Sequence, residues 1–235
     1  MSAKSTLTKS LTIAAVIIAL TGMLSWLIIY LSPPFVPRNN QPLVLPAAEV
    51  KEYQGQKLDS INDFVENSIK GPQYVDIKNY HLKIKGLVAK EKNLTYDEVI
   101  SKFKPYQKAV KLNCVEGWSV NILWEGFLLR DLLAEAEVKP SAKTIILRSV
   151  DGYSTSFPVN YFTDNDIIIA YKMNGILLPP ERGFPFQLVA ESKWGYKWIK
   201  WITEIELSAD SGYHGYWESR GYSNDGDLDK YYLGF

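Results

Sequence analysis

A single cysteine in 235 residues limits how this chain can hold a fold together. Cys114 has no second cysteine to pair with, so an internal disulfide is excluded. A structural zinc site uses up to four ligands, and only His81 and His214 are available beside this thiol. The thiol is then a buried spectator, a nucleophile or a single soft ligand to a metal whose other ligands come with a cofactor.

An apolar stretch near the N-terminus is long enough to cross a membrane. Residues 11–31 are apolar apart from two threonines, a glycine and a serine, which is close to the ~20 residues that a transmembrane helix needs. We find no convincing cleavage site after it, so we interpret it as an uncleaved anchor rather than a secretory signal. Lys4 and Lys9 on one side against Arg38 on the other favour residues 1–10 in the cytoplasm. We therefore expect a single-pass membrane protein whose globular domain lies outside the cytoplasm.

Composition separates a linker from one globular domain. Residues 32–46 contain five of the twelve prolines, which is typical of an extended linker. We expect the globular domain over residues 47–210 and an aromatic C-terminal tail over 211–235; the roughly 190 residues after the linker are enough for one sizeable core. The 26 basic and 26 acidic residues are interspersed and sum to zero net charge. No basic face is left for a nucleic acid, so that class of partner is excluded.

Hydrophobic periodicity predicts a strand-rich α+β domain with few short helices. Helices are predicted over 60–69, over 95–103 with a Thr95/Glu98 capping box, and over 125–137 with a leucine stripe. Alternation of polar and apolar residues predicts a strand over 81–87. Runs rich in β-branched and aromatic residues predict strands over 144–148, 154–157, 167–171, 186–190 and 201–207.

Three blocks of sequence resemble one family. They are CVEGWS from Cys114, followed by WEGF from Trp124; DGYSTSFP from Asp151; and NGILLPPERGFPFQLVAESKWGYKWIKWI over 174–202. In this order they resemble the molybdopterin-binding domain of the sulfite oxidase family. Within that family the likeness is greatest to the catalytic subunit of the periplasmic methionine-sulfoxide reductase. The resemblance covers roughly residues 80–207 and implies the sulfite-oxidase-type fold with a Mo-molybdopterin cofactor.

The resemblance also implies roles for particular residues. Cys114 falls on the cysteine whose thiolate is the sole protein ligand to molybdenum, which makes it the catalytic and metal-binding residue. Ser149 falls where the reductase has a threonine that contacts the cofactor. Trp198, Ile199 and Lys200 fall on the tripeptide whose backbone and lysine hold the pterin phosphate.

Three departures from the family pattern bear on these roles. Arg182 stands where the family has asparagine or histidine, and Gln187 stands where it usually has arginine. Our hypothesis is that the cation has moved, so that Arg182 reaches the phosphate or pterin from a new direction. Asn113 replaces the arginine that helps to form an anion pocket in sulfite oxidases, which makes a tetrahedral sulfur anion a less suitable substrate. A cofactor-free, membrane-tethered binding module is the alternative, although the retained Cys114 argues against it.

The implied activity is oxygen-atom transfer, most simply the reduction of a sulfoxide-type small molecule. The alternative reaction is a sulfite-oxidase-like oxidation of a small substrate. The chain shows no haem-binding region, flavin fold or nicotinamide fingerprint, so electrons must come from another protein, and a membrane b-type cytochrome is the partner that the resemblance implies. Family members that carry this cofactor are exported already folded, by a route whose signal contains a pair of arginines. No such pair precedes Leu11, so a domain that faces the cytoplasm is the alternative orientation.

The C-terminal tail leaves two interpretations. It is too short for the immunoglobulin-like dimerisation domain of eukaryotic sulfite oxidases, so we expect a monomeric domain. Tyr216, Trp217 and Arg220 either wrap the mouth of the cofactor site or belong to a segment that covers a sheet edge.

Overall fold

A computed structural model describes residues 48–63 and 65–234, all of which belong to one compact unit, Leu45–Phe235. The predicted anchor over 11–31 and the linker over 32–46 lie outside the described residues. Within the described ranges, no helix has the length and hydropathy needed to span a bilayer.

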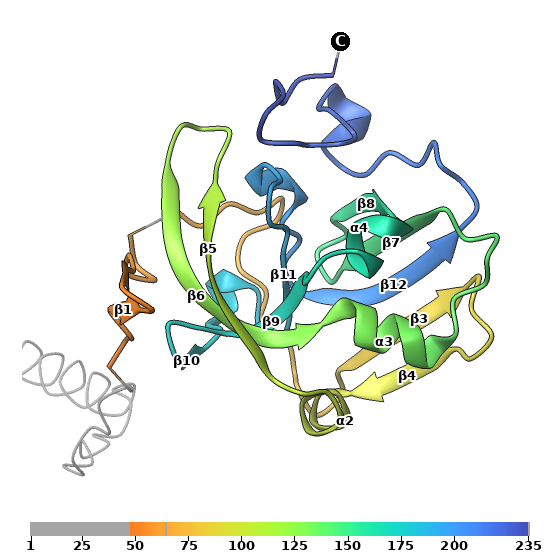
Figure 1. The fold of residues 1–235 in the computed structure, drawn as a ribbon, viewed down its shortest axis with the longest axis horizontal. Coiled ribbons are helices and arrows are strands. Elements are labelled where there is room, and N and C mark those ends of the chain that lie inside the picture. Colours follow the sequence, from red (N-terminus) through yellow and green to blue (C-terminus); the bar gives the residue numbers. More distant parts are fainter. Residues whose placement is uncertain (1–47, 64, 235) are drawn as a thin grey trace, which may run out of the picture. The chain divides into compact units, whose positions relative to one another are not determined.

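Two sheets carry the fold (Figure 1). In one sheet the strand order is β10-β9-β6-β5, and β11 also pairs with β9; in the other the order is β4-β3-β12-β7-β8. Neighbouring strands are antiparallel except for the parallel pair of β3 and β12. The strands are β1 Glu52–Tyr53, β2 Gln56–Lys57, β3 His81–Gly86, β4 Lys92–Thr95, β5 Tyr106–Asn113, β6 Ser119–Leu128, β7 Thr144–Ser149, β8 Ser154–Pro158, β9 Ile168–Met173, β10 Ile176–Leu177, β11 Gln187–Val189 and β12 Ile202–Ser208. The strand-rich fold with few helices is thereby confirmed.

Helices are short and stand between strands. The α-helices are α2 Tyr96–Lys102, α3 Leu129–Ala136 and α4 Val159–Thr163, and the 3-10 turns are η1 Pro180–Arg182, η2 Gly195–Lys197 and η3 Glu218–Arg220. The capping box predicted for α2 is confirmed. Thr95 Oγ1 accepts a hydrogen bond from the Glu98 amide at 3.3 Å, and the Thr95 amide donates to the Glu98 carboxylate at 2.8 Å.

The helix predicted over 125–137 is wrong in its first third. Residues up to Leu128 belong to β6, where Phe127 pairs with Ile169 of β9, and only Leu129–Ala136 is helical. A continuous apolar run satisfies both a helical stripe and a buried strand, so pairing with β9 decided between them. Gly126 permits that pairing, because a Cβ at this position would lie 1.9 Å from the Ile169 carbonyl oxygen.

The helix predicted over 60–69 is also wrong. Its described residues, 60–63 and 65–69, contain no helix; a turn begins the segment, where the Ser60 amide donates to the Asp63 carboxylate at 2.8 Å. Such local side-chain bonds compete with helix formation. Val65, which the spacing of the apolar residues would place on the buried face of such a helix, is 64% exposed. Residues 65–69 instead line the cavity described below.

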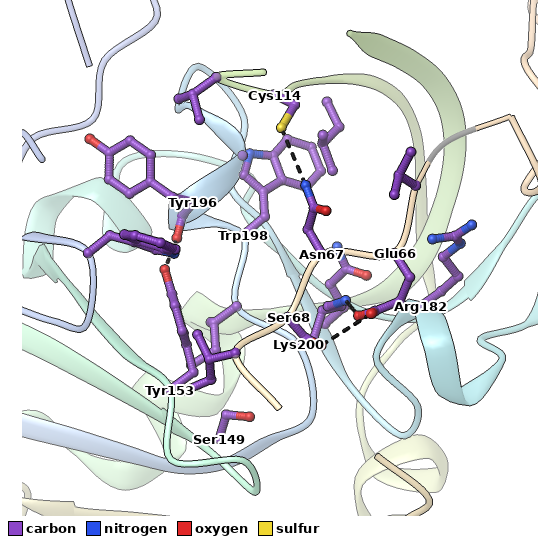
Figure 2. A pocket seen from close by; sticks show the side chains of 18 of the residues that line it. Glu66, Asn67, Ser68, Cys114, Ser149, Tyr153, Arg182, Tyr196, Trp198 and Lys200 are labelled. Carbon is purple, nitrogen blue, oxygen red and sulfur yellow. Dashed lines mark hydrogen bonds and ion pairs between the residues drawn. The ribbon is translucent and has the colours of Figure 1, made fainter. Parts of the chain in front are cut away.

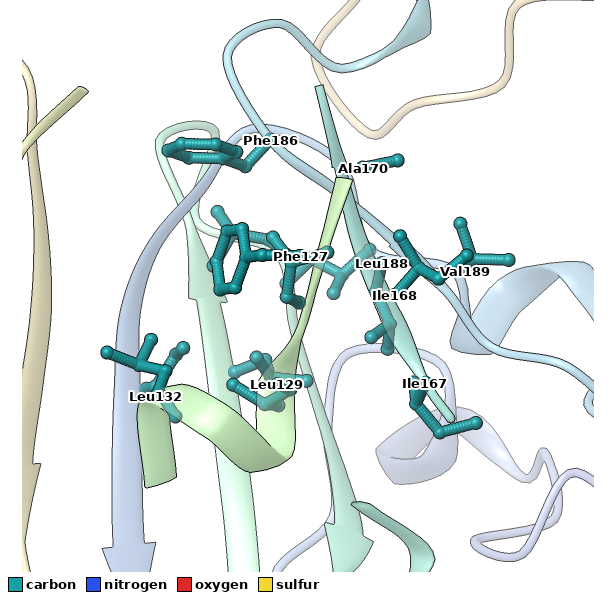
Figure 3. Packing of buried hydrophobic residues seen from close by; sticks show 14 of the residues in the cluster. Phe127, Leu129, Leu132, Ile167, Ile168, Ala170, Phe186, Leu188 and Val189 are labelled. Carbon is teal, nitrogen blue, oxygen red and sulfur yellow. The ribbon is translucent and has the colours of Figure 1, made fainter. Parts of the chain in front are cut away.

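One apolar core joins both sheets, and Phe127 lies in its interior (Figure 3). The Phe127 ring stacks on Phe103 with centroids 5.2 Å apart and meets Phe186 edge-on at 5.8 Å. Phe186 directly precedes β11. The core thereby supports the segment that leads into the site.

We expect Phe127→Ala to lower the free energy of unfolding by about 3–5 kcal/mol, because it removes a fully buried ring and leaves a cavity. Urea denaturation monitored by circular dichroism measures this change. Tyr74→Ala is the matched control, since the Tyr74 side chain is 77% exposed and its loss should change the free energy by less than about 0.5 kcal/mol. Equal effects of the two changes would contradict the assigned core.

Candidate active site

The predicted site residues all border one cavity of about 380 Å³ (Figure 2). They are Cys114, Ser149, Arg182, Gln187, Trp198, Ile199 and Lys200. The lining also includes residues 65–69, the loop around Cys114, the turns after β7 and at 195–196, and two residues of the C-terminal tail. The volume falls in the range of pockets that hold small organic ligands and cofactors.

Cys114 lies in the turn between β5 and β6. Its amide donates to the Trp118 carbonyl at 2.9 Å, and its carbonyl accepts from Gly117 at 3.1 Å. Gly117 has φ of 91°, which favours glycine at that place. The turn holds the thiol at the wall of the cavity, where Asn67 Nδ2 lies 3.8 Å from the sulfur.

The surroundings of the thiol do not make it a nucleophile on its own. Burial, the largest influence, raises the pKa of Cys114, and the nearby Glu116 carboxylate acts in the same direction. Reactive cysteines sit beside lysine, arginine or protonated histidine, which stabilise the thiolate. Here a bound metal cation would supply that stabilisation, so the metal-ligand interpretation fits these surroundings better than the nucleophile.

Glu116 places a negative charge beside the thiol. Its carboxylate accepts from Asn67 Nδ2 at 3.0 Å and from Trp118 Nε1 at 3.1 Å. These two hydrogen bonds lower the pKa of Glu116. The group therefore stays ionised at neutral pH and is poorly suited to act as a general acid.

The cationic part of the cavity lies away from the thiol. Figure 2 shows Glu66, Arg182 and Lys200 grouped together, with the Asn67 side chain between this group and Cys114. Lys200 Nζ is 2.6 Å from a Glu66 carboxylate oxygen. Burial lowers the pKa of Lys200, and Glu66 opposes that shift.

Arg182 lies beside Lys200, as the hypothesis of a moved cation requires. It ends η1, and its Nε donates to the Ile61 carbonyl at 3.2 Å. Burial lowers the pKa of Arg182 from a value so high that the guanidinium stays charged. Gln187 is buried on the same cavity.

The tripeptide over 198–200 contributes mainly through its lysine. The Trp198 amide donates to Gly195 at 3.0 Å and the Ile199 amide to Lys197 at 3.1 Å, so both groups are engaged within the turn. The side chains of these two residues are buried in the core cluster. The Lys200 ammonium is therefore the polar side-chain group that the tripeptide presents to the cavity.

Ser149 provides a direct sign that the cavity suits a polar ligand. Its hydroxyl is buried and has no hydrogen-bond partner among the described residues. Its amide and carbonyl are both used, by Tyr153 and Gly152. A buried polar group without a partner is rare in native proteins and commonly marks a ligand or water. A thiol, an unpaired hydroxyl and two cations around one cavity fit a soft metal, a hydrogen-bonding ring system and a phosphate, which are the parts of the molybdenum–pterin cofactor.

Several lining residues were missed from the sequence. Glu66 and Asn67 lie in the segment predicted as a helix, and no local pattern indicated that they face Cys114 and Lys200. In the tail, Trp217 lines the cavity as one interpretation suggested, and Tyr222 joins it. Tyr216 instead packs on Tyr153, and Arg220 is exposed.

Comparison with known proteins agrees with this geometry. The chain matches the family model described as oxidoreductase molybdopterin binding domain over residues 69–217. The uncharacterized oxidoreductase YuiH of Bacillus subtilis (strain 168) is 32% identical over 157 residues, which cover 66% of this chain and 78% of that protein. The family-model match therefore covers the cavity residues from Ile69 to Trp217.

A solved structure shares the fold. The crystal structure of the sulfane dehydrogenase SoxCD from Paracoccus pantotrophus aligns with a TM-score of 0.58 and 25% sequence identity. The alignment covers 66% of this chain and 43% of that chain, so this chain spans less than half of the SoxCD chain that it matches.

Proposed function

This chain belongs to the oxidoreductase molybdopterin-binding domain family, of the sulfite oxidase type, and from that premise we propose that it reduces a neutral organic sulfoxide. The reaction removes one oxygen atom, consumes two electrons and two protons, and yields the thioether and water. The observation that carries the choice of substrate is the charge around Cys114, where an ionised Glu116 lies and the lining cations are grouped elsewhere.

Different residues of the cavity would bind different parts of the cofactor. When bound, the molybdenum–pterin group supplies the oxygen-atom transfer and the storage of two electrons. Cys114 would provide the protein's sulfur ligand, and the side-chain amide of Asn67 lies 3.8 Å from that sulfur. The Ser149 hydroxyl would donate to the pterin, while Lys200 and Arg182 would hold the phosphate in competition with Glu66.

Charge distinguishes the proposal from its runner-up, the oxidation of a small sulfur anion. The likeness to a sulfane dehydrogenase gives that reaction its support. An anion approaching Cys114 would meet the Glu116 carboxylate, and Asn113 provides no positive charge there. A neutral sulfoxide does not meet this repulsion.

The membrane parts of the proposal rest on the sequence. We propose that residues 11–31 anchor the domain outside the cytoplasm and that a membrane b-type cytochrome delivers the electrons. The anchor keeps the domain near such a partner. Protease accessibility of the domain in intact spheroplasts tests the orientation, and co-purification of a haem protein with the full chain tests the partner.

The reaction is tested on the full chain purified from a host that makes the cofactor. We expect close to one molybdenum and one pterin per chain, and reduction of methyl phenyl sulfoxide with a reduced viologen as electron donor. Sulfite with ferricyanide as acceptor is the counter-assay. A loaded enzyme that oxidises sulfite and leaves the sulfoxide untouched would overturn the proposed reaction.

Arg182→Ala should lower the pterin and molybdenum content of the purified protein, by roughly tenfold if the guanidinium makes one charge-assisted hydrogen bond to the cofactor. The content is measured by mass spectrometry of the metal and by pterin fluorescence after release. Gln187→Ala is the companion variant, since Gln187 occupies the family's arginine position. Full content in Arg182→Ala would remove that residue from the site.

A further inference from the structure

The C-terminal segment 213–232 lies on the turn that precedes the cofactor tripeptide. The Trp194 amide donates to Gly226 at 2.8 Å, the Leu228 amide donates to Ser192 at 3.0 Å, and the hydroxyl of Tyr196 donates to Ser223 at 2.7 Å. These bonds run along the whole turn 192–196. The segment is therefore built into the site rather than appended to the domain.

A buried ion pair locks this arrangement. Lys197 Nζ lies 2.7 Å from a Glu218 carboxylate oxygen, and both side chains have 0% exposure. The same ammonium donates to the Ser156 carbonyl at 2.7 Å and the Asn224 carbonyl at 2.9 Å, and Glu218 accepts from Thr155 at 2.6 Å. A buried pair adds little net stability, but its geometry is specific. Lys197 immediately precedes the tripeptide over 198–200, so the pair sets the segment in a fixed position relative to it.

The segment held by this ion pair places two aromatic rings at the wall of the cavity. Trp217 and Tyr222 line the cavity with ring centroids 5.1 Å apart, and Tyr222 meets Tyr196 edge-on, also at 5.1 Å. Tyr196 follows Gly195, whose added Cβ would lie 3.5 Å from the Cys114 Cα atom. The rings thus continue the wall that begins at the candidate metal ligand. Tyr222 lies beyond the residues that the family model matches.

We propose that Trp217 and Tyr222 form a specificity wall, which selects substrates carrying an aromatic or bulky apolar group next to the reacting sulfur. The inference rests on the proposed sulfoxide reduction for its reacting group, and on ring geometry for its selectivity. Aromatic faces bind apolar and aromatic groups through burial of apolar area and ring–ring contact. A small sulfoxide such as dimethyl sulfoxide carries only two methyl groups and therefore offers little apolar area to either ring.

The test compares binding of methyl phenyl sulfoxide and dimethyl sulfoxide to oxidised, cofactor-loaded full chain by calorimetry. Trp217→Ala and Tyr222→Ala should each weaken binding of the phenyl compound by about tenfold and change that of dimethyl sulfoxide by less than about twofold. Tyr222→Phe keeps the ring and should therefore keep the wild-type preference for the phenyl compound. Tyr231→Ala is the control, because that ring belongs to the same segment and is 64% exposed. Metal content and thermal unfolding of every variant are measured alongside.

Outcomes for the wall and for the reaction are separable. Ring-dependent binding of the phenyl compound without its reduction would leave the wall standing and overturn the proposed reaction. If both sulfoxides are reduced, and if Tyr231→Ala weakens binding of the phenyl compound as much as the two ring variants do, the wall is overturned and the reaction stands. Wild-type protein that binds the two sulfoxides equally well also overturns the wall.

Discussion

Cys114→Ser is expected to reduce sulfoxide turnover by more than about 100-fold, since even the residues that support a metal ligand typically contribute 10–100-fold. The hydroxyl is a harder and much less acidic donor than the thiol, so it replaces a soft thiolate poorly at the metal. The fold should persist, because the residue sits in a turn beside Asn67 and Glu116 rather than in the apolar core. Steady-state kinetics and X-ray absorption at the molybdenum edge measure the two consequences.

Lys111→Ser is the matched control for this substitution. Lys111 is an exposed residue of β5 three positions before Cys114, and it does not line the cavity. The control should retain wild-type turnover and the full number of sulfur neighbours around molybdenum, while Cys114→Ser should show one sulfur fewer. Substantial turnover in Cys114→Ser would end the assignment of this thiol as the metal ligand.

Lys200→Met is expected to weaken cofactor retention by roughly 10- to 150-fold, because a hydrogen bond to a charged group contributes about 1.5–3 kcal/mol. The methionine side chain keeps most of the volume of lysine and removes only the ammonium. Retention is measured as the pterin and molybdenum that remain per chain after dialysis. Lys172→Met is the matched control, since Lys172 also pairs with a carboxylate, at 2.7 Å from Glu125, yet lies outside the cavity.

The partner of Lys200 complicates this variant and provides a second test. Removing the ammonium leaves the Glu66 carboxylate without its ion pair, and that alone lowers stability. The double variant Lys200→Met with Glu66→Gln removes both charges and should recover thermal stability. It should not recover cofactor retention. If the double variant holds the cofactor as tightly as wild type, Lys200 does not bind the phosphate.

Residues with strong local signals were predicted correctly from the sequence. The Thr95/Glu98 pair starts α2 as expected, because a capping box is a contact between residues three apart. Alternating polar and apolar residues located β3, and β-branched or aromatic composition located β7 and β8, each to within about two residues. Six of the seven predicted site residues lie in the three motif blocks and Ser149 lies two residues before the second block; the structure brings all seven to one cavity.

Residues whose role depends on distant partners were not predicted. The apolar run through Phe127 and Leu128 suits a helix and a strand equally, and β9, about forty residues later, made it a strand. Segment 60–69 has a helical pattern of apolar residues, yet Glu66 bonds to Lys200 across 134 positions of sequence. A short stretch of sequence, of the length used to predict a helix, cannot contain both residues of that pair.

The sequence alone determined the family of this protein and its strand-rich domain, and it located the thiol and the lysine that we assign to the cofactor site. Only the tertiary structure decided which segments close the cavity, where the negative charge of Glu116 lies relative to the lining cations, and that the tail supplies two of its rings. The physical reason is range. Capping, alternation and motif spacing act between neighbours in sequence, whereas the Lys200–Glu66 and Lys197–Glu218 pairs form only when packing brings distant elements together.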